Sequence, residues 1–88
     1  MHHGWATIVL ADNIGRNFSV YQNVTVGYGK GGKPSIGNNV TIYTGAVVVG
    51  KITIGDNVRI AANSMVRKDI PAGSLVYGNP AVVVLNDK

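Results

Sequence analysis

The sequence contains no cysteine and only four acidic residues, all of them aspartate. Without cysteine there can be no disulfide bond, no cysteine-ligated metal site and no thiol nucleophile. A domain of 88 residues buries only about 60% of the surface of its unfolded chain, so it is marginally stable on its own. We therefore expect oligomerisation to supply the stability that disulfide bonds cannot.

Long hydrophobic runs are missing as well. The longest, residues 46–49 and 81–85, are far too short to cross a bilayer. The chain also does not open with a basic segment followed by an apolar one, which is the pattern of a secretory leader. These absences favour a cytoplasmic protein without a membrane partner.

The charge balance is modestly positive. Eight lysine and arginine residues against four acidic ones give a net charge of +4. Such a balance is typical of an ordinary solvated surface, and it also suits a polyanionic ligand such as the phosphates of a nucleotide cofactor. A dense basic run with interleaved aromatic residues is missing, so nucleic acid is not expected as a partner.

Aliphatic residues recur every six positions, which indicates an internal repeat. The segment at residues 27–35 interrupts the recurrence and holds four glycines, two lysines and one proline. This composition predicts a protruding loop, because glycine and proline interrupt regular structure. The two runs of aliphatic residues are Ile14, Val20 and Val26, and then Ile36, Ile42, Val48, Ile54, Ile60 and Val66.

A second series of apolar or small residues, from Phe18 to Ile70, lies two positions before the residues of the first series. Side chains two positions apart point to the same face of a strand, and the Asn-rich segments between them suit turns with left-handed backbone angles. Three sides of six residues make one coil of about 18 residues. Residues one coil apart are then expected to stack at about 4.8 Å, the spacing of neighbouring strands.

The expected stacks, called columns below, contain like residues. Stacked asparagines can form a ladder of amide hydrogen bonds. Like residues would not coincide in so many columns by accident, so the sequence predicts a parallel β-helix. The columns are Ile14, Ile36 and Ile54; Val20, Ile42 and Ile60; Gly15, Gly37 and Gly55; Asn17, Asn39 and Asn57; and Tyr21 with Tyr43.

Two repeats carry a resemblance to a known family. The segments 36–41 (Ile-Gly-Asn-Asn-Val-Thr) and 54–59 (Ile-Gly-Asp-Asn-Val-Arg) resemble the repeats of the hexapeptide acyltransferase superfamily. The resemblance implies an all-β fold, namely a single-stranded left-handed parallel β-helix of hexapeptide repeats with one protruding loop. It also implies a homotrimer with acyl-CoA sites between the subunits.

We expect one β-helix domain over residues 1–88, with the loop at 27–35 and a C-terminal cap and tail at 72–88. The tail has turn-forming residues followed by an apolar closing strand, and it resembles the tail of the serine acetyltransferases. At the other end, Met1 falls inside a coil. We therefore expect that the chain is a fragment or that a partner covers the exposed strand edge.

The only histidines, His2 and His3, begin a segment, residues 2–9, that is similar to the catalytic segment of serine acetyltransferases. The repeats, the loop and a Gly-Asn-Pro-Ala tail follow in the same order as in that family. The resemblance implies that His3 is the general base, a role that suits imidazole because it titrates near neutral pH. An adjacent histidine pair does not match the three metal-binding histidines of a β-helical carbonic anhydrase, so no metal is expected.

The coil spacing places His3 at one end of two neighbouring columns. The resemblance implies that Thr44 and Ala62, farther along, contact the pantetheine arm of acetyl-CoA through their backbone. Three coils span about 14 Å, which suits an extended arm with its thioester near His3. The two columns are His3, Tyr21, Tyr43 and Ala61, and Gly4, Gln22, Thr44 and Ala62.

Four further residues are candidates for binding acetyl-CoA. Tyr28 and Lys30 lie in the loop, which we expect to close over the acetyl-CoA of a neighbouring subunit. Arg67 and Lys68 lie near the far end of the columns, where the nucleotide phosphates would fall. Ordinary solvated charge is the simpler interpretation of the last pair.

Two candidate acceptor-binding residues depart from the serine acetyltransferase pattern. His2 replaces an acidic residue, and Lys33 replaces a histidine that in that family helps to hold the substrate carboxylate. Lys33 can still bind a carboxylate, so a serine-like amino acid and a sugar are both open as the acceptor.

The sequence thus predicts an O-acetyltransferase that uses acetyl-CoA as co-substrate and His3 as general base. The alternative is a truncated, catalytically inactive β-helix that serves as an assembly module. The alternative arises because the acidic partner that the family places upstream of this histidine is missing. Regular outward threonine columns are missing too, which excludes an ice-binding β-helix.

Overall fold

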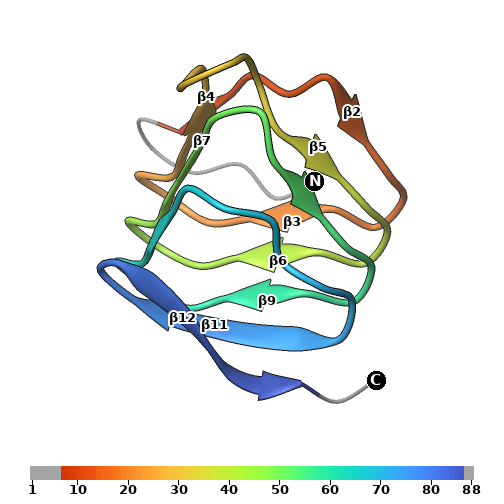
Figure 1. Ribbon diagram of the computed structural model, residues 1–88, viewed down its shortest axis with the longest axis vertical. Coiled ribbons are helices and arrows are strands. Elements are labelled where there is room, and N and C mark those ends of the chain that lie inside the picture. Colours follow the sequence, from red (N-terminus) through yellow and green to blue (C-terminus); the bar gives the residue numbers. More distant parts are fainter. Residues whose placement is uncertain (1–6, 87–88) are drawn as a thin grey trace.

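The computed structural model describes residues 7–86, and this part of the chain is built from short strands without any helix (Figure 1). The strands wind into a left-handed parallel β-helix, the fold that the repeat predicts and the hand that the family resemblance implies. Consistent with this, the described residues include no helix that is long and apolar enough to span a membrane.

Each of the first three coils contributes one strand to each of three sheets. The four-stranded sheet contains β1 (Ile8–Val9), β4 (Thr25–Gly27), β7 (Val47–Val49) and β10 (Met65–Val66). The three-stranded sheet contains β2 (Asn13–Ile14), β5 (Ser35–Ile36) and β8 (Thr53–Ile54). The five-stranded sheet contains β3 (Ser19–Val20), β6 (Thr41–Ile42), β9 (Arg59–Ile60), β11 (Ser74–Gly78) and β12 (Ala81–Asn86).

The strand register confirms the predicted columns. Parallel pairing joins Ile14 to Ile36 and Ile36 to Ile54 in the three-stranded sheet. In the five-stranded sheet, Ile42 pairs with Val20 on one side and with Ile60 on the other, as predicted. One assignment is wrong: Ile70, expected to lie two positions before a column residue, pairs with Ile54 itself. The last coil is shorter than the others between Val66 and Ile70, and this shifts its register.

Both apolar series fill the inside of the coil. The one clear exception in the first series is Ile14, which is 43% exposed because β2 is the edge strand of its sheet. Burial of one aliphatic side chain contributes about 1.5–3 kcal/mol, so the repeated interior is the main stabilising feature. The hydrophobic residues with no exposed surface are Val20, Val24, Val26, Val40, Ile42, Ala46, Val48, Ile54, Val58, Ile60, Val66 and Val76.

The corner between the three-stranded and five-stranded sheets, residues 15–18, 37–40 and 55–58, is called the asparagine corner. Asn17, Asn39 and Asn57 each turn the chain there with φ of 59°, a left-handed angle that asparagine tolerates better than most residues. The Asn17 side-chain amide donates to Oδ1 of Asn39 at 2.8 Å, and the Asn39 amide donates to Oδ1 of Asn57 at 3.2 Å. The predicted amide ladder is therefore present.

An antiparallel hairpin of β11 and β12 follows the last coil. Its turn contains a cis peptide bond between Asn79 and Pro80. The Gly78 N–H donates to the hydroxyl of Ser64 at 3.1 Å, and Ser64 is itself buried in the coil. The hairpin is thus attached to the coil by a hydrogen bond as well as by its pairing with β9.

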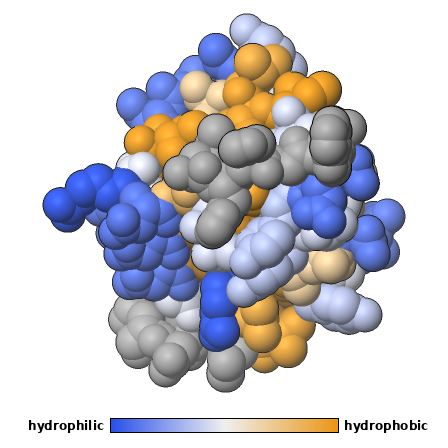
Figure 2. All heavy atoms as spheres, turned by 180° about the vertical axis from the view of Figure 1, so that it is seen from behind, coloured by the Kyte–Doolittle hydropathy of each residue, from blue (hydrophilic) through white to orange (hydrophobic). Residues whose placement is uncertain are grey.

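Exposed aliphatic side chains lie in the first described coil and in the last strand. Ile8 and Leu10 are about half exposed, and so are Val82 and Val84 on β12. Seen from behind, the molecule shows one hydrophobic area in the upper part of the view and another at its lower edge, separated by hydrophilic residues (Figure 2).

Candidate functional site

The column of Gln22, Thr44 and Ala62 lies at the corner between the five-stranded and four-stranded sheets. The Gly45 N–H donates to the carbonyl of Gln22 at 3.2 Å, and the Asn63 N–H donates to the carbonyl of Thr44 at 3.0 Å. Thr44 is half-buried, whereas Gln22 and Ala62 are exposed. The backbone of successive coils is thus tied together along a surface that a ligand can reach.

Left-handed backbone angles shape this corner as well. The residues that follow the column have φ of 59° at Asn23, 78° at Gly45 and 61° at Asn63. A Cβ atom at Gly45 would collide with Oδ1 of Asn63, so a larger residue here would have to displace that side chain as well as adopt the left-handed angle. The local sequence therefore places Thr44 in a tight turn with little backbone freedom.

The neighbouring column brings two tyrosines together. The rings of Tyr21 and Tyr43 are stacked, with 5.1 Å between their centroids and 23° between their planes. The Thr7 hydroxyl donates to the carbonyl of Tyr21 at 2.9 Å. His2 and His3, predicted to continue this end of the site, lie outside the described residues.

The corner between the four-stranded and three-stranded sheets, residues 28–34, 50–52 and 67–69, is called the loop corner. The loop folds back at its own base, where the Gly29 N–H donates to the carbonyl of Gly32 at 3.0 Å. The Lys51 N–H of the next coil donates to the carbonyl of Lys30 at 3.2 Å. A Cβ atom at Gly29 would lie 2.6 Å from the nitrogen of Gly50, so the loop backbone contacts the next coil directly.

A carboxylate holds two lysines at the loop corner. Asp12 lies 3.4 Å from Nζ of Lys51 and 3.9 Å from Nζ of Lys33. The Lys33 ammonium also lies 5.3 Å from the centroid of the Tyr28 ring, within the range of a cation–π contact. The two predicted site residues Tyr28 and Lys33 are thus side by side.

Sequence reasoning missed Asp12 and Lys51, although the column count offered a signal. Asp12 is in register with Pro34, whose carbonyl accepts from its N–H at 2.8 Å. The residue before Pro34 is Lys33, and Lys51 occupies the same position one coil later. Extending the columns to charged residues would have brought these three side chains together.

A cleft of about 480 Å³ lies beside the loop. Three cationic side chains border it, those of Lys30, Lys51 and Arg67. Two of them, Lys30 and Arg67, were predicted from the sequence as candidates for binding acetyl-CoA. The remaining lining residues are Gly29, Val49, Gly50 and Ile52.

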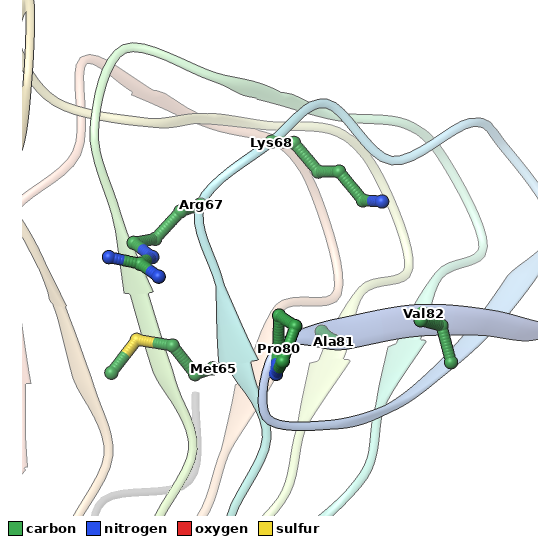
Figure 3. Close-up of a pocket in the computed structure, with 6 residues that line it drawn as sticks. All are labelled: Met65, Arg67, Lys68, Pro80, Ala81 and Val82. Carbon is green, nitrogen blue, oxygen red and sulfur yellow. The ribbon is translucent and has the colours of Figure 1, made fainter.

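A second hollow, of about 230 Å³, lies where β10 approaches the closing hairpin. Arg67 and Lys68 extend to opposite sides of the chain that follows β10, and the Pro80–Val82 segment lies below them in the view of Figure 3. Met65 and Ala81 complete the lining. Arg67 therefore borders both hollows, whereas Thr44 and Ala62 lie at a different corner of the coil.

Comparison with known proteins points to one family. A model named "Bacterial transferase hexapeptide (six repeats)" matches residues 33–68. The serine acetyltransferase of Staphylococcus xylosus is 45% identical over 97% of this chain, which corresponds to 42% of that enzyme. The chain therefore spans less than half the length of this curated relative.

Solved structures agree with this result. A maltose O-acetyltransferase from Clostridium difficile is 30% identical and superimposes with a TM-score of 0.77, over 97% of this chain and 58% of its own. A serine acetyltransferase in complex with CoA is 29% identical with a TM-score of 0.71, over 92% of this chain and 37% of its own. Both similarities extend through most of the coil.

Proposed function

Because the chain belongs to the hexapeptide-repeat superfamily of acyltransferases, we propose that it forms the catalytic β-helix of an O-acetyltransferase. The enzyme would move an acetyl group from acetyl-CoA to a hydroxyl of a small acceptor. Its relatives include serine acetyltransferases and a maltose O-acetyltransferase, so a serine-like amino acid and a sugar are both candidate acceptors.

The column of Gln22, Thr44 and Ala62 is the observation that carries the proposal. It runs along the coil, and consecutive members are one strand spacing of about 4.8 Å apart. An extended pantetheine arm suits such a surface, because its two amides can bond to backbone groups of Thr44 and Ala62. The complex of a similar serine acetyltransferase with CoA supports acetyl-CoA as the donor.

Cations near both hollows support binding of the phosphates of acetyl-CoA. Lys30 and Arg67 border the cleft beside the loop, and Arg67 and Lys68 border the hollow beside the hairpin. Arginine and lysine side chains bind phosphate through charge-assisted hydrogen bonds. Tyr28, exposed on the loop, would cover the donor from one side.

His3 acts as general base in this proposal. It takes the proton of the acceptor hydroxyl as the oxygen attacks the thioester carbonyl. The tetrahedral oxyanion then collapses, the carbon–sulfur bond breaks, and the CoA thiolate takes the proton from His3. The products are the O-acetyl ester and free CoA, with no covalent acyl-enzyme.

Acceptor binding would involve His2 and Lys33. Asp12 already lies 3.9 Å from Nζ of Lys33, so a carboxylate on the acceptor must share this lysine with Asp12. We further propose a cytoplasmic homotrimer in which neighbouring subunits share each site. Association would bury additional surface of a small chain that has no disulfide bond.

The test is release of CoA from acetyl-CoA, measured with a thiol reagent in the presence of serine or maltose. We expect release that depends on the acceptor, and a fall of about 10²–10⁴-fold in His3→Ala, as is typical of removing a general base. Val84→Ala, an exposed position on β12, is the control and should leave the rate unchanged. If no hydroxyl acceptor causes release and acetyl-CoA does not bind, the chain is an assembly module instead.

A further inference from the structure

The column that contains Tyr21, Tyr43 and Ala61 lies on the outer face of the five-stranded sheet. It includes one more residue, which a constant coil of 18 residues does not predict. The N–H of Tyr21 donates to the carbonyl of Ile42, that of Tyr43 to Ile60, and that of Ala61 to Val76. Because Val76 pairs with Ile60, the next residue, Tyr77, lies beside Ala61. The column therefore reads Tyr21, Tyr43, Ala61 and Tyr77, with a single small residue between aromatic ones.

The small residue leaves a slot between two rings. The stacking of Tyr21 on Tyr43 at 5.1 Å indicates that side chains of this column lie over one another. The methyl group of Ala61 cannot fill the corresponding layer, and Tyr77 beyond it is 61% exposed. Two strand spacings separate Tyr43 from Tyr77, or about 10 Å, so one further ring fits between them.

The spacing admits a flat ring as well as a saturated one, because Tyr21 and Tyr43 stack at 5.1 Å and two such spacings equal the gap between Tyr43 and Tyr77. The polar groups beside the slot favour a pyranose ring, which carries hydroxyl groups around its rim. Its C–H faces are apolar and suit the faces of tyrosine rings.

A polar cleft on the same face supplies partners for the hydroxyl groups at the rim of a sugar. The cleft has a volume of about 430 Å³ and is lined by Asn39, Thr41, Asn57, Arg59 and Gly73. Arg59 and Ala61 are two positions apart on β9 and so point to the same side. Within residues 7–86, the Arg59 guanidinium makes no hydrogen bond or ion pair.

We propose that the outer face of the five-stranded sheet binds a carbohydrate, with one sugar ring in the slot between Tyr43 and Tyr77. Figure 1 shows this face as β3, β6, β9 and β11 lying one below another. The level of Ala61 is three coils, or about 14 Å, from the level expected for His3. A saccharide of several units spans that distance, which makes an oligosaccharide the acceptor; this last step rests on the proposed function.

Binding is tested by titration calorimetry of the full chain with maltotetraose and chitotetraose, without acetyl-CoA. Ala61→Tyr adds the missing ring to the column and fills the slot, so saccharide affinity should fall about tenfold or more, the scale of one or two lost ring contacts. Tyr77→Ala should weaken binding in the same direction. Thr53→Tyr adds a tyrosine to the three-stranded sheet instead and should leave the affinity unchanged.

Three outcomes would overturn the proposal. In the first, neither saccharide binds the wild type. In the second, both saccharides bind Ala61→Tyr as tightly as the wild type, while the β-sheet circular dichroism of the variant is intact. In the third, Ala61→Tyr lowers the affinity for adenosine 3′,5′-bisphosphate but not the affinity for either saccharide. A saccharide that binds in the slot without any acetyl transfer would support the surface and contradict the proposed function. Acetyl transfer to serine without saccharide binding would do the reverse.

A kinetic comparison tests the acceptor step. With an oligosaccharide acceptor, KM should rise in Ala61→Tyr by the same factor as the dissociation constant. With a methyl monosaccharide, which cannot span from the slot to His3, KM and kcat should not change. An equal rise in KM for both acceptors would show that the slot does not contribute to acceptor recognition.

Discussion

The asparagine corner and the loop corner turn the same coil, yet only one of them repeats. Six residues separate the core residues on either side of the asparagine corner in each coil, as from Ile36 to Ile42 and from Ile54 to Ile60. Across the loop corner the separation is ten residues from Val26 to Ile36 but only four from Val66 to Ile70. Variation in length is therefore confined to one corner.

The two corners also differ in chemistry. At the asparagine corner, polar groups form hydrogen bonds between coils, such as the 2.7 Å bond from the Asn38 N–H to Oδ1 of Asp56. The loop corner leaves cations beside a cleft, among them Lys30 and Arg67. Repetition satisfies polar groups within the protein, whereas departures from repetition leave groups available to a ligand. The cationic candidates for binding phosphate, Lys30 and Arg67, therefore lie where the repeat is interrupted.

The largest effect should follow from breaking the repeated corner with Asn39→Ala. An alanine at φ of 59° costs about 1–2 kcal/mol, and the two lost ladder bonds cost about 1 kcal/mol each before water replaces them. We expect a total loss of about 2–3 kcal/mol, measured by urea denaturation.

Asn39→Gly separates the two causes. Glycine accepts the left-handed angle without strain but makes no ladder bond, so its loss of stability should be clearly smaller than that of alanine. Equal losses for alanine and glycine would mean that the backbone angle contributes little. The asparagine corner would then owe its regularity to the amide ladder alone.

Most of the fold was predictable because the same residue types recur at the same spacing in each repeat. The core columns and the asparagine ladder were all read from a constant spacing, which strand pairing then confirmed. The assignment of Ile70 was wrong because the shortened corner changes only the spacing of the core residues, whereas the lengthened corner is also rich in glycine. The same shortening hid Tyr77, which stands sixteen residues after Ala61 rather than the usual eighteen.

The candidate site was less predictable than the fold. Thr44 and Ala62 were assigned by resemblance, and Arg67 and Lys68 from their place near the far end of the columns. The roles of all four stay predictions. The grouping of Asp12 with Lys33 and Lys51 was missed because the columns were not extended to these residues, although they occupy neighbouring positions of three consecutive coils.

A medium effect is expected from Gly29→Ala at the loop corner. Its Cβ would lie 2.6 Å from the nitrogen of Gly50, so the loop must move away from the next coil, at a cost of about 1–2 kcal/mol. Gly27→Ala is the matched control, because a Cβ there meets nothing within 4 Å. Thermal denaturation of both variants should show a lower Tm for Gly29→Ala only; equal Tm values would mean that the loop is not fixed against the coil.

The smallest effect, and the one that most sharpens the contrast, is expected from Asp12→Asn. The two ion pairs of Asp12 are partly exposed at 3.4 and 3.9 Å, so their loss should cost less than about 1 kcal/mol. The difference from the wild type should shrink further as salt is raised, because salt screens exposed charges.

Asp56→Asn provides the comparison at the asparagine corner. Asn38 already fills the equivalent position one coil earlier, where its Oδ1 accepts from the Arg16 N–H at 2.8 Å, so an asparagine at 56 can accept the same kind of bond. Its stability should stay near that of the wild type at every salt concentration. If Asp56→Asn were the salt-sensitive variant and Asp12→Asn were not, charge would stabilise the repeated corner, and the division of roles between the two corners would be wrong.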